Sequence, residues 1–343
     1  MADVLLDVKD LAIAYRDAKG EEVRLVDGVS FQLRRGEALG LAGESGCGKT
    51  TTALSLLGLL PGNLYRASGS IELDSKQGIM HLHRRTERGF RELRWANVSI
   101  VFQGSMNALD PCMRISDQMA EAIRLHDREI DRQGVRERIA ELFGYVGLSV
   151  NRANQYPHEF SGGMRQRAMI ALALACKPEI VIGDEPTTAL DVMMQAQILE
   201  LLEELRRDLG LAMLLITHDL SVLAETCDRV AIMYAGQIAE EGPIDALFHS
   251  PQHPYTQRLL GAFPTVGGPR TLAPPIPGAP PDPADPPSGC LFHPRCHKAR
   301  EQCTDGRVDM RSVGQEHGAR CLFAPWPPGE LEPLNVPAEA TSG

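Results

Sequence analysis

Short apolar runs separated by polar turns predict most of the strands along this chain. Near the N-terminus, the segments VLLDVKDLAIAY and EEVRLVDGVSFQL predict antiparallel strands that alternate with turns. The segment RVAIMYAGQIAEEG (229–242) predicts a hairpin that turns at Ala235-Gly236. Further short apolar runs predict buried strands. These runs cover residues 37–42, 68–73, 98–102, 180–184 and 212–217.

Longer segments with helical spacing of apolar residues lie between the predicted strands. The polar and basic stretch 76–95 instead predicts a solvent-exposed helix or loop. Strands that alternate with helices are typical of an α/β fold with a parallel sheet, here with a mostly helical insertion between two of its parts. The predicted helices cover 52–60, 116–148, the run AMIALALA, 194–209, a short helix opened by Pro243, and 255–262.

The composition is that of a folded protein. The chain has 343 residues, 43% hydrophobic and 23% charged, enough for one large domain or two smaller ones. No apolar run approaches the roughly 18 residues of a membrane span, and the N-terminus lacks a signal-peptide pattern. The net charge of −10 argues against wholesale nucleic-acid binding. We therefore expect a cytosolic protein whose membrane contacts go through a partner.

Residues 43–51 match the pattern G-x-x-x-x-G-K-T of a phosphate-binding loop. Predicted strand and helix flank them, and the glycines let successive backbone N–H groups face a phosphate at a helix N-terminus. Lys49 supplies a charge for the β- and γ-phosphates, and the Thr50 hydroxyl can ligate Mg²⁺. Kinases, GTPases, motors and transporters all share such a loop. The candidate ATP-binding residues in it are Gly43, Glu44, Ser45, Gly46, Cys47, Gly48, Lys49, Thr50 and Thr51.

Three further segments place polar residues where parallel sheets bind ligands. Asp184 ends an apolar run and can hold Mg²⁺, and the adjacent Glu185 can polarise an attacking water. His218 follows another predicted strand, and Ser161-Gly162-Gly163 predicts a capped helix N-terminus that can bind a second anion. Taken singly, these features are equally compatible with a surface turn, a structural histidine and an ordinary helix cap.

In their order along the chain these motifs resemble the ATP-binding-cassette (ABC) ATPases over about residues 4–262. The match also includes Tyr15, Gln103 and the Ala189-Leu190-Asp191 loop. The resemblance implies an α/β P-loop ATPase with a mixed sheet core, an N-terminal antiparallel β subdomain and a helical signature subdomain. It also implies ATP and Mg²⁺ as cofactors, and a dimer of cassettes that holds two ATP molecules head to tail.

The resemblance also assigns roles to single residues. Tyr15 would stack on adenine, and Gln103 would sense Mg²⁺ and the membrane partner. Ser161, Gly162 and Gly163 would bind the γ-phosphate of ATP held by the opposite cassette. The remaining roles would be catalytic base for Glu185, γ-phosphate contact for His218, Mg²⁺ binding for Thr50, Gln103 and Asp184, and ATP-site membership for Asp191.

Within that family the chain resembles the nucleotide-binding subunits of oligopeptide/dipeptide importers. The segments FSGGMRQRAMIALAL, GDEPTTALDV, HPYTQRLL and GCLFHPRC carry this resemblance, with Met164 where most cassettes have glutamine. Gly104-Ser105 departs from the common Asp-Pro pair and Gly183 replaces a frequent alanine, but neither change removes a reacting group. The implied function is ATP hydrolysis that powers import of di- or oligopeptides, with nickel or oligosaccharides as alternatives in the same group.

Importers of this kind imply several partners. These are a second ABC ATPase subunit, expected to be a non-identical sister chain, two integral membrane permease subunits and an extracytoplasmic solute-binding protein, with no nucleic acid. The chain would lie at the cytoplasmic face of the membrane. Two other classes stay open: a soluble cassette ATPase of DNA repair or translation, and a P-loop kinase, against which the signature and His218 argue.

Four of the eight cysteines cluster near the C-terminus with the spacing C-x5-C-x6-C-x17-C. In a cytosolic chain they favour a soft metal over disulfides, although the spacing is not common among zinc fingers. The resemblance implies a [4Fe-4S] cluster, with Zn²⁺ or free thiols as alternatives. A segment of about 35 residues buries little apolar surface by itself, so a metal would act as a staple. The cysteines are Cys290, Cys296, Cys303 and Cys321.

Changes in composition suggest how the chain is divided. We expect an ABC ATPase domain over residues 1–262, with a helical subdomain over about 104–178. Ten of the 24 residues in 264–287 are proline, which predicts an extended linker over 263–289. A small Cys-rich, metal-binding extension would follow over 290–325, and a flexible tail over 326–343.

Overall fold

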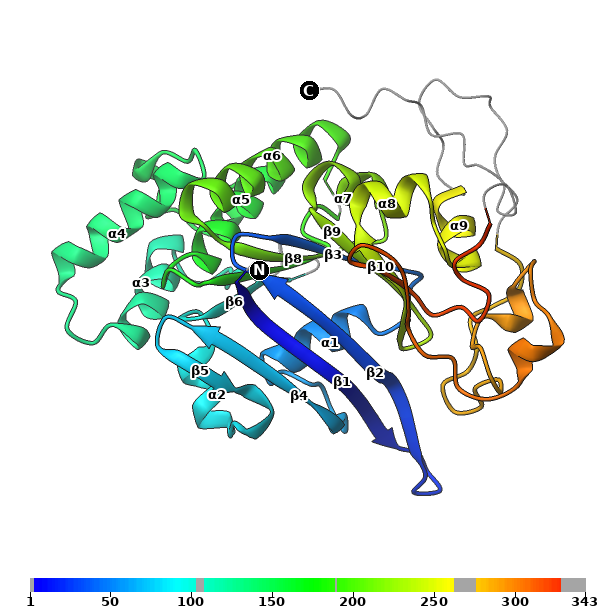
Figure 1. The fold of residues 1–343 in the computed structure, drawn as a ribbon. Coiled ribbons are helices and arrows are strands. Elements are labelled where there is room, and N and C mark those ends of the chain that lie inside the picture. The colour runs from blue at the N-terminus through cyan, green and yellow to red at the C-terminus, as the bar shows by residue number, and fades with distance from the viewer. Residues whose placement is uncertain (1–2, 103–107, 189, 262–275, 328–343) are drawn as a thin grey trace.

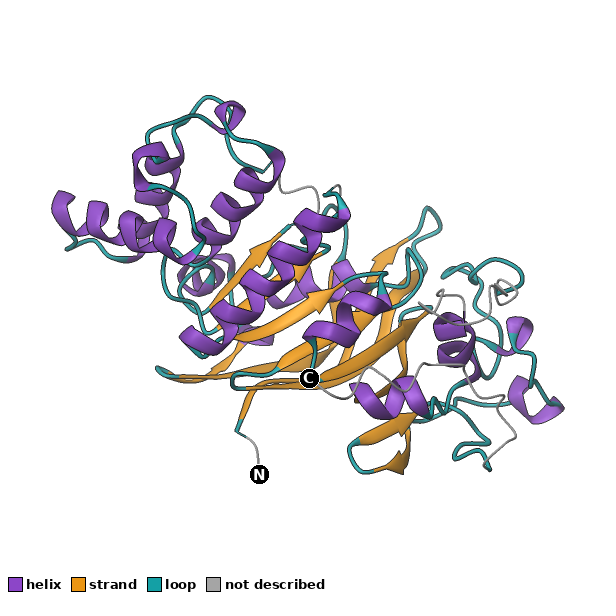
Figure 2. Cartoon of the chain, turned by 90° about the horizontal axis from the view of Figure 1, so that it is seen from above, coloured by secondary structure: helices purple, strands orange, loops and turns teal. Residues whose placement is uncertain are grey.

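The computed structural model describes residues 3–102, 108–188, 190–261 and 276–327. Two β-sheets pack against each other, and most helices cover the outer face of the larger sheet (Figures 1 and 2). The C-terminal residues lie at one end of this assembly, beside the last strands of the larger sheet (Figure 1).

The smaller sheet is antiparallel, with strand order β2-β1-β4-β5. It confirms the antiparallel strands predicted near the N-terminus, but residues 76–95 form more structure than predicted. That stretch contains a strand and a helix, α2 (Glu87–Leu93), because Leu82, Phe90 and Leu93 are buried against the sheet. The strands are β1 (Val4–Arg16), β2 (Glu22–Arg34), β4 (Tyr65–Ser75) and β5 (Gly78–His81).

The larger sheet is mixed, with strand order β11-β12-β10-β9-β3-β8-β7-β6. Its five strands from β9 to β6 run parallel, and the other three are antiparallel to their neighbours. This arrangement confirms the predicted α/β fold with a mixed sheet and the hairpin at Ala235-Gly236. The strands are β3 (Ala38–Ala42), β6 (Val98–Val101), β7 (Ile180–Asp184), β8 (Ala212–Ile216), β9 (Arg229–Tyr234), β10 (Gln237–Pro243), β11 (Arg311–Gly314) and β12 (His317–Ala319).

The parallel strands are buried on both faces, and successive side chains enter two different cores. In β3, Leu39 and Leu41 pack toward the smaller sheet and α1 (Lys49–Leu56), whereas Ala38 and Ala42 pack toward the helices on the other face. This double burial is why the strands read as nearly continuous apolar runs in the sequence.

The helices over the outer face come from both halves of the chain. Those between β6 and β7 are α3 (Ile115–His126), α4 (Arg132–Tyr145) and α5 (Gly162–Ala173), as the helical prediction for this region requires. The later ones are α6 (Val192–Leu209), α7 (Leu220–Thr226), α8 (Ile244–His249) and α9 (Pro254–Gly261). Short 3-10 turns span Leu82–Arg84, Val150–Arg152, Pro157–Glu159, His293–Arg295 and Glu301–Thr304.

The C-terminal residues are not a separate module in this structure. Strand β12 pairs with β10, so the segment extends the larger sheet instead of folding by itself. Phe292, fully buried, packs its ring against Tyr234 of β9 and Tyr255 of α9, at centroid distances of 5.1 and 5.3 Å. Pairing with the sheet and packing of the aromatic rings therefore hold this segment in place.

Candidate nucleotide-binding site

The phosphate-binding loop follows β3 directly and needs its glycines for two different reasons. Gly43 has a φ of +147°, and a side chain there would collide with the carbonyl oxygen of Met233. Gly48 has a φ of +101° and forms the N-cap of α1. The helix therefore starts at Lys49, three residues before the predicted start, because the loop passes straight into it.

Lys49 is held against the loop that carries it. Its side chain is buried, and Nζ donates to the carbonyl oxygens of Gly43 and Glu44 at 2.8 and 3.0 Å. The ammonium is thus fixed at the base of the loop, close to the N-terminus of α1, where an anion is favoured.

Thr50 and Asp184 meet at the strand ends, as the Mg²⁺ prediction requires. The Thr50 hydroxyl donates to Oδ1 of Asp184 at 3.1 Å, and Asp184 is only 2% exposed. Burial raises the pKa of Asp184, and a nearby cation would offset that cost of the charged form. Mg²⁺ is bound through one or two protein oxygens together with waters and phosphates, so this hydroxyl and carboxylate fit the ion.

Glu185 has the geometry of a positioned general base. Its φ is +48°, a strained value for a residue other than glycine, and strain of this kind is often found at functional sites. The carboxylate lies 2.9 Å from Nδ1 of His218 and accepts a hydrogen bond from the Thr188 hydroxyl at 2.9 Å. Burial alone would raise the pKa of Glu185, but the hydrogen bonds to His218 and Thr188 outweigh it and leave the pKa lowered.

The signature residues lie at the start of α5. Ser161 is its N-cap and accepts a hydrogen bond from the Met164 N–H at 3.4 Å. A side chain at Gly163 would overlap the methyl group of Met194 in α6, so the two helices approach closely here. Among the described residues, we find no hydrogen bond from residues 161–163 to the phosphate loop, which is consistent with a role toward another cassette.

Of the remaining predicted site residues, the structure describes some and not others. Asp191 is the N-cap of α6 and accepts from the Met194 N–H at 2.9 Å. Tyr15 lies in β1 opposite Val23, partly exposed, in the sheet that flanks the loop. Gln103 and Ala189 lie outside the described residues.

Three contacts at the site escape sequence reasoning. Thr188 orients Glu185, and Gln166 of α5 donates from Nε2 to the Pro186 carbonyl oxygen at 2.5 Å, which connects the signature helix to the Asp184-Glu185 turn. Arg295, from the C-terminal segment, forms an ion pair with Glu44 of the loop. A threonine or glutamine near a motif is too common to be singled out by sequence alone, and Arg295 is 251 residues away from its partner.

The four clustered cysteines line one cavity, together with Phe292, Phe323 and Trp326. All eight cysteines of the chain are unpaired. Burial raises the pKa of Cys296 to about 12, so its thiol is protonated at neutral pH. Among the described residues, no group of three or more His, Cys, Asp or Glu side chains is arranged to hold a metal ion. The predicted metal-binding extension is therefore not supported: the thiols share a cavity but are not gathered into a ligand set.

Comparison with known proteins agrees with this arrangement. Residues 26–188 match the family described as ABC transporter, and residues 239–303 match the family described as oligopeptide/dipeptide transporter, C-terminal region. The chain is 44% identical to a probable peptide ABC transporter ATP-binding protein of Sinorhizobium fredii, over 93% of this chain and 95% of that protein. The chain belongs to the ABC transporter family.

Other similar proteins support the same assignment for the ABC chain. It is 39% identical to the dipeptide transport ATP-binding protein DppD of Escherichia coli, over 93% of this chain and 96% of that protein. The dimeric structure of MJ0796, a bacterial ABC transporter cassette, aligns with a TM-score of 0.61 and 26% identity, over 70% of this chain and 99% of that chain. The cbiO1 cassette of Clostridium perfringens aligns with a TM-score of 0.60 and 27% identity, over 72% of this chain and 91% of that chain.

The family and the site together establish an ATPase subunit of an ABC transporter, with the α/β fold of that family. No helix in the described part of the chain is long and apolar enough to cross a membrane. The two solved cassettes align with 70% and 72% of this chain, and the oligopeptide/dipeptide C-terminal family matches residues 239–303.

Proposed function

We propose that this chain is the nucleotide-binding subunit of an importer of di- or oligopeptides. The observation that carries the proposal is the similarity to peptide and dipeptide transport ATP-binding proteins over 93% of the chain, which includes the C-terminal region as well as the cassette. Relatives that share only the cassette fold would leave the substrate class open.

At the ATP site, each residue has a task that follows from its position. The backbone of residues 43–48 and the buried Lys49 bind and orient the phosphates. Thr50 and Asp184 would hold Mg²⁺, which would screen the phosphate charge when bound. Glu185 accepts a proton from the attacking water, and His218 keeps that carboxylate oriented through the 2.9 Å contact. Tyr15 stacks on the adenine.

The site is completed by a second cassette. We infer that Ser161 to Gly163, at the N-terminus of α5, bind the γ-phosphate in the partner's site. Asp191 is assigned to the ATP site, and Gln103 would sense Mg²⁺ and the membrane partner. The partner is a non-identical sister chain, and two permease subunits and an extracytoplasmic solute-binding protein make up the rest of the complex, with this chain on the cytoplasmic side.

The substrate is tested by ATP hydrolysis in the assembled complex. The chain is co-expressed with its sister chain and permeases, purified in lipid nanodiscs, and assayed with the solute-binding protein loaded with a dipeptide, a pentapeptide, Ni²⁺ or an oligosaccharide. We expect the peptide-loaded binding protein to raise the hydrolysis rate several-fold. Stimulation by the nickel- or oligosaccharide-loaded protein alone would contradict peptide import, and failure to co-purify with permeases would contradict a transport role.

We also propose that Cys290, Cys296, Cys303 and Cys321 bind a [4Fe-4S] cluster, with Zn²⁺ as the alternative. The four thiols line one cavity, and soft sulfur ligands of this type bind both iron–sulfur clusters and zinc. The Cys296 thiol is protonated at neutral pH because burial raises its pKa to about 12, so metal binding would release its proton. The cluster would supply structural support or redox sensing, because the cavity presents no open position for the transported solute.

Anaerobic purification tests the metal. We expect brown protein with broad absorbance at about 400 nm and about four irons per chain, since four thiolates hold one such cluster. Cys296→Ser should bleach it, whereas Cys112→Ser, an exposed cysteine outside the cavity, should not. Colourless protein that contains one zinc per chain would show that the site binds zinc and not an iron–sulfur cluster. Metal-free protein whose four thiols are all alkylated would exclude both metals.

The division of the chain follows from the same proposal. Residues 1–262 form the ATPase domain, with the helical subdomain over about 104–178. We assign residues 263–289 to a linker, 290–325 to the Cys-rich region and 326–343 to a tail. Within this division, the pairing of β12 with β10 supports an accessory segment that is built onto the ATPase domain.

A further inference from the structure

The C-terminal segment reaches the phosphate-binding loop at Glu44. Nη1 and Nη2 of Arg295 donate to the two carboxylate oxygens of Glu44 at 2.7 and 3.0 Å, a bidentate pair. The Arg295 side chain is 5% exposed and that of Glu44 is 26% exposed, so this pair is shielded from water far more than a surface ion pair.

Arg295 is itself fixed from several sides. Nε donates to the Pro277 carbonyl oxygen at 2.8 Å, and Nη1 also donates to the Tyr234 hydroxyl at 3.3 Å. The hydrogen bonds to Glu44 raise the pKa of Arg295 further above its usual value, so the guanidinium is charged at every relevant pH. A side chain held this way presents a rigid fork to the loop.

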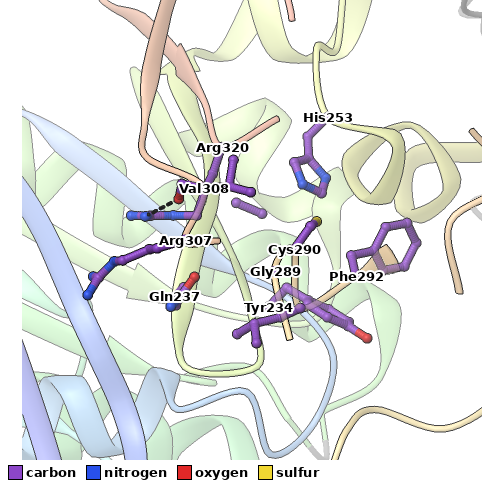
Figure 3. Close-up of a pocket in the computed structure, with 11 residues that line it drawn as sticks. Tyr234, Gln237, His253, Gly289, Cys290, Phe292, Arg307, Val308 and Arg320 are labelled. Atoms are coloured by element: carbon purple, nitrogen blue, oxygen red, sulfur yellow. Dashed lines mark hydrogen bonds between the residues drawn. The ribbon is translucent and has the colours of Figure 1, made fainter. Parts of the chain in front are cut away.

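The backbone of Glu44 is bound from the same direction. Its N–H donates to the Tyr255 hydroxyl at 3.0 Å, and its carbonyl oxygen accepts from Lys49 at 3.0 Å. The rings of Tyr234, Tyr255 and Phe292 pack together, with the first two at a centroid distance of 4.6 Å. Tyr234 and Phe292 also line the cavity shown in Figure 3, between the main sheet and the C-terminal segment.

We propose that Arg295 is a positioning residue that holds the phosphate loop in its nucleotide-binding conformation, so that ATP affinity depends on docking of the C-terminal segment. A loop that is already ordered loses less conformational entropy when it closes on phosphate, and this raises affinity. The inference rests on the proposed ATP site and extends it by a regulatory contact. Because coupling is reciprocal, bound ATP must in turn stabilise the docked segment.

The proposal predicts a change in affinity without a comparable change in the chemical step. Arg295→Met keeps an unbranched side-chain stem and removes the guanidinium, and should raise the Kd and KM for ATP about tenfold, a typical coupling factor. The kcat at saturating ATP should stay within about twofold, because positioning contributes equally to ground and transition states. Binding is measured with a fluorescent ATP analogue on the full chain, and KM and kcat on the assembled complex.

Two controls separate positioning from loss of structure. Arg300→Met removes an arginine of the same segment whose guanidinium lies over the Phe323 and Trp326 rings, and should leave ATP affinity unchanged. Glu44→Gln breaks the ion pair from the other side. If Arg295 acts on ATP affinity through its ion pair with Glu44, adding Glu44→Gln to Arg295→Met should weaken ATP binding no further. If the two residues act independently, their effects on the Kd would multiply.

Hydrogen exchange provides the reciprocal readout. In a hydrolysis-deficient Glu185→Gln background, ATP should slow amide exchange in residues 290–303, and this slowing should disappear with Arg295→Met. An Arg295→Met chain with wild-type ATP affinity and unchanged ATP-dependent protection would overturn the proposal, as would an Arg300→Met chain with an equal loss of affinity. Lys49→Ala separates failure of the Arg295 proposal from failure of the proposed ATP site. If Lys49→Ala binds ATP with wild-type affinity, the proposed ATP site itself is wrong.

Discussion

Glu185→Gln is expected to retain ATP binding while hydrolysis by the assembled complex falls about 100- to 10,000-fold, the usual contribution of a general base. The carboxylate is ionised at neutral pH because the hydrogen bonds to His218 and Thr188 lower its pKa despite partial burial. An amide preserves the shape of the side chain and can still contact His218, but it cannot accept a proton from water.

Steady-state phosphate release measures this effect, and binding of a fluorescent ATP analogue shows that the site stays intact. Glu204→Gln, which changes an exposed carboxylate on α6, is the matched control and should hydrolyse ATP at the wild-type rate. Turnover of Glu185→Gln at the wild-type rate would remove Glu185 from the catalytic role.

Lys49→Ala is expected to lower the affinity for nucleotide, whereas Glu185→Gln lowers the rate of hydrolysis. A charge-assisted hydrogen bond contributes about 1.5–3 kcal/mol, so affinity should fall roughly 10- to 150-fold. In the structure Nζ of Lys49 donates to two loop carbonyls at 2.8 and 3.0 Å and to the Cys47 sulfur at 3.7 Å. Its removal leaves the fold of the loop supported by the glycine turns and by the hydrogen bond from the Glu44 N–H to Tyr255.

Equilibrium binding to the full chain measures this loss, together with the thermal unfolding midpoint. Lys76→Ala, an exposed lysine in the turn between β4 and β5, should bind as tightly as the wild type. Wild-type affinity in Lys49→Ala, or a large drop in the unfolding midpoint that accompanies its weaker binding, would count against a direct phosphate contact.

The sequence predicts the strands that carry the site because each is buried on both faces. A run such as 180–183 must be apolar throughout, and the polar residues that follow it, Asp184-Glu185, then fall at the end of the strand. Chain order and the phosphate-loop pattern suffice to place Thr50 next to Asp184. The 2.9 Å contact between Glu185 and His218 needs the adjacent placement of β7 and β8, which a parallel sheet supplies.

The elements that the sequence does not predict are those whose stability comes from distant residues. Strands β11 and β12 lie in the polar segment RSVGQEHGA. They form because β12 pairs with β10, next to the parallel part of the larger sheet. Strand β5 depends in the same way on its pairing with β4. The Arg295–Glu44 pair joins residues that are 251 positions apart in the sequence, so no local pattern predicts it.

The cysteine segment shows a different limit of sequence reasoning. The spacing of four thiols indicates their chemistry, and the structure does bring all four to one cavity. Whether thiols form a ligand set depends on distances that the backbone fixes within tenths of an ångström. The support expected from a metal is supplied here by β12 and by the buried ring of Phe292.

Uptake of a radiolabelled dipeptide into proteoliposomes tests the central claim most directly, namely that ATP hydrolysis at Glu185 of this chain powers peptide import. The complex is reconstituted with the solute-binding protein on one side of the membrane and ATP on the side of this chain. We predict that the wild type accumulates peptide only with ATP, and that Glu185→Gln, although it still binds ATP, accumulates none. Accumulation by Glu185→Gln at the wild-type rate would contradict the account.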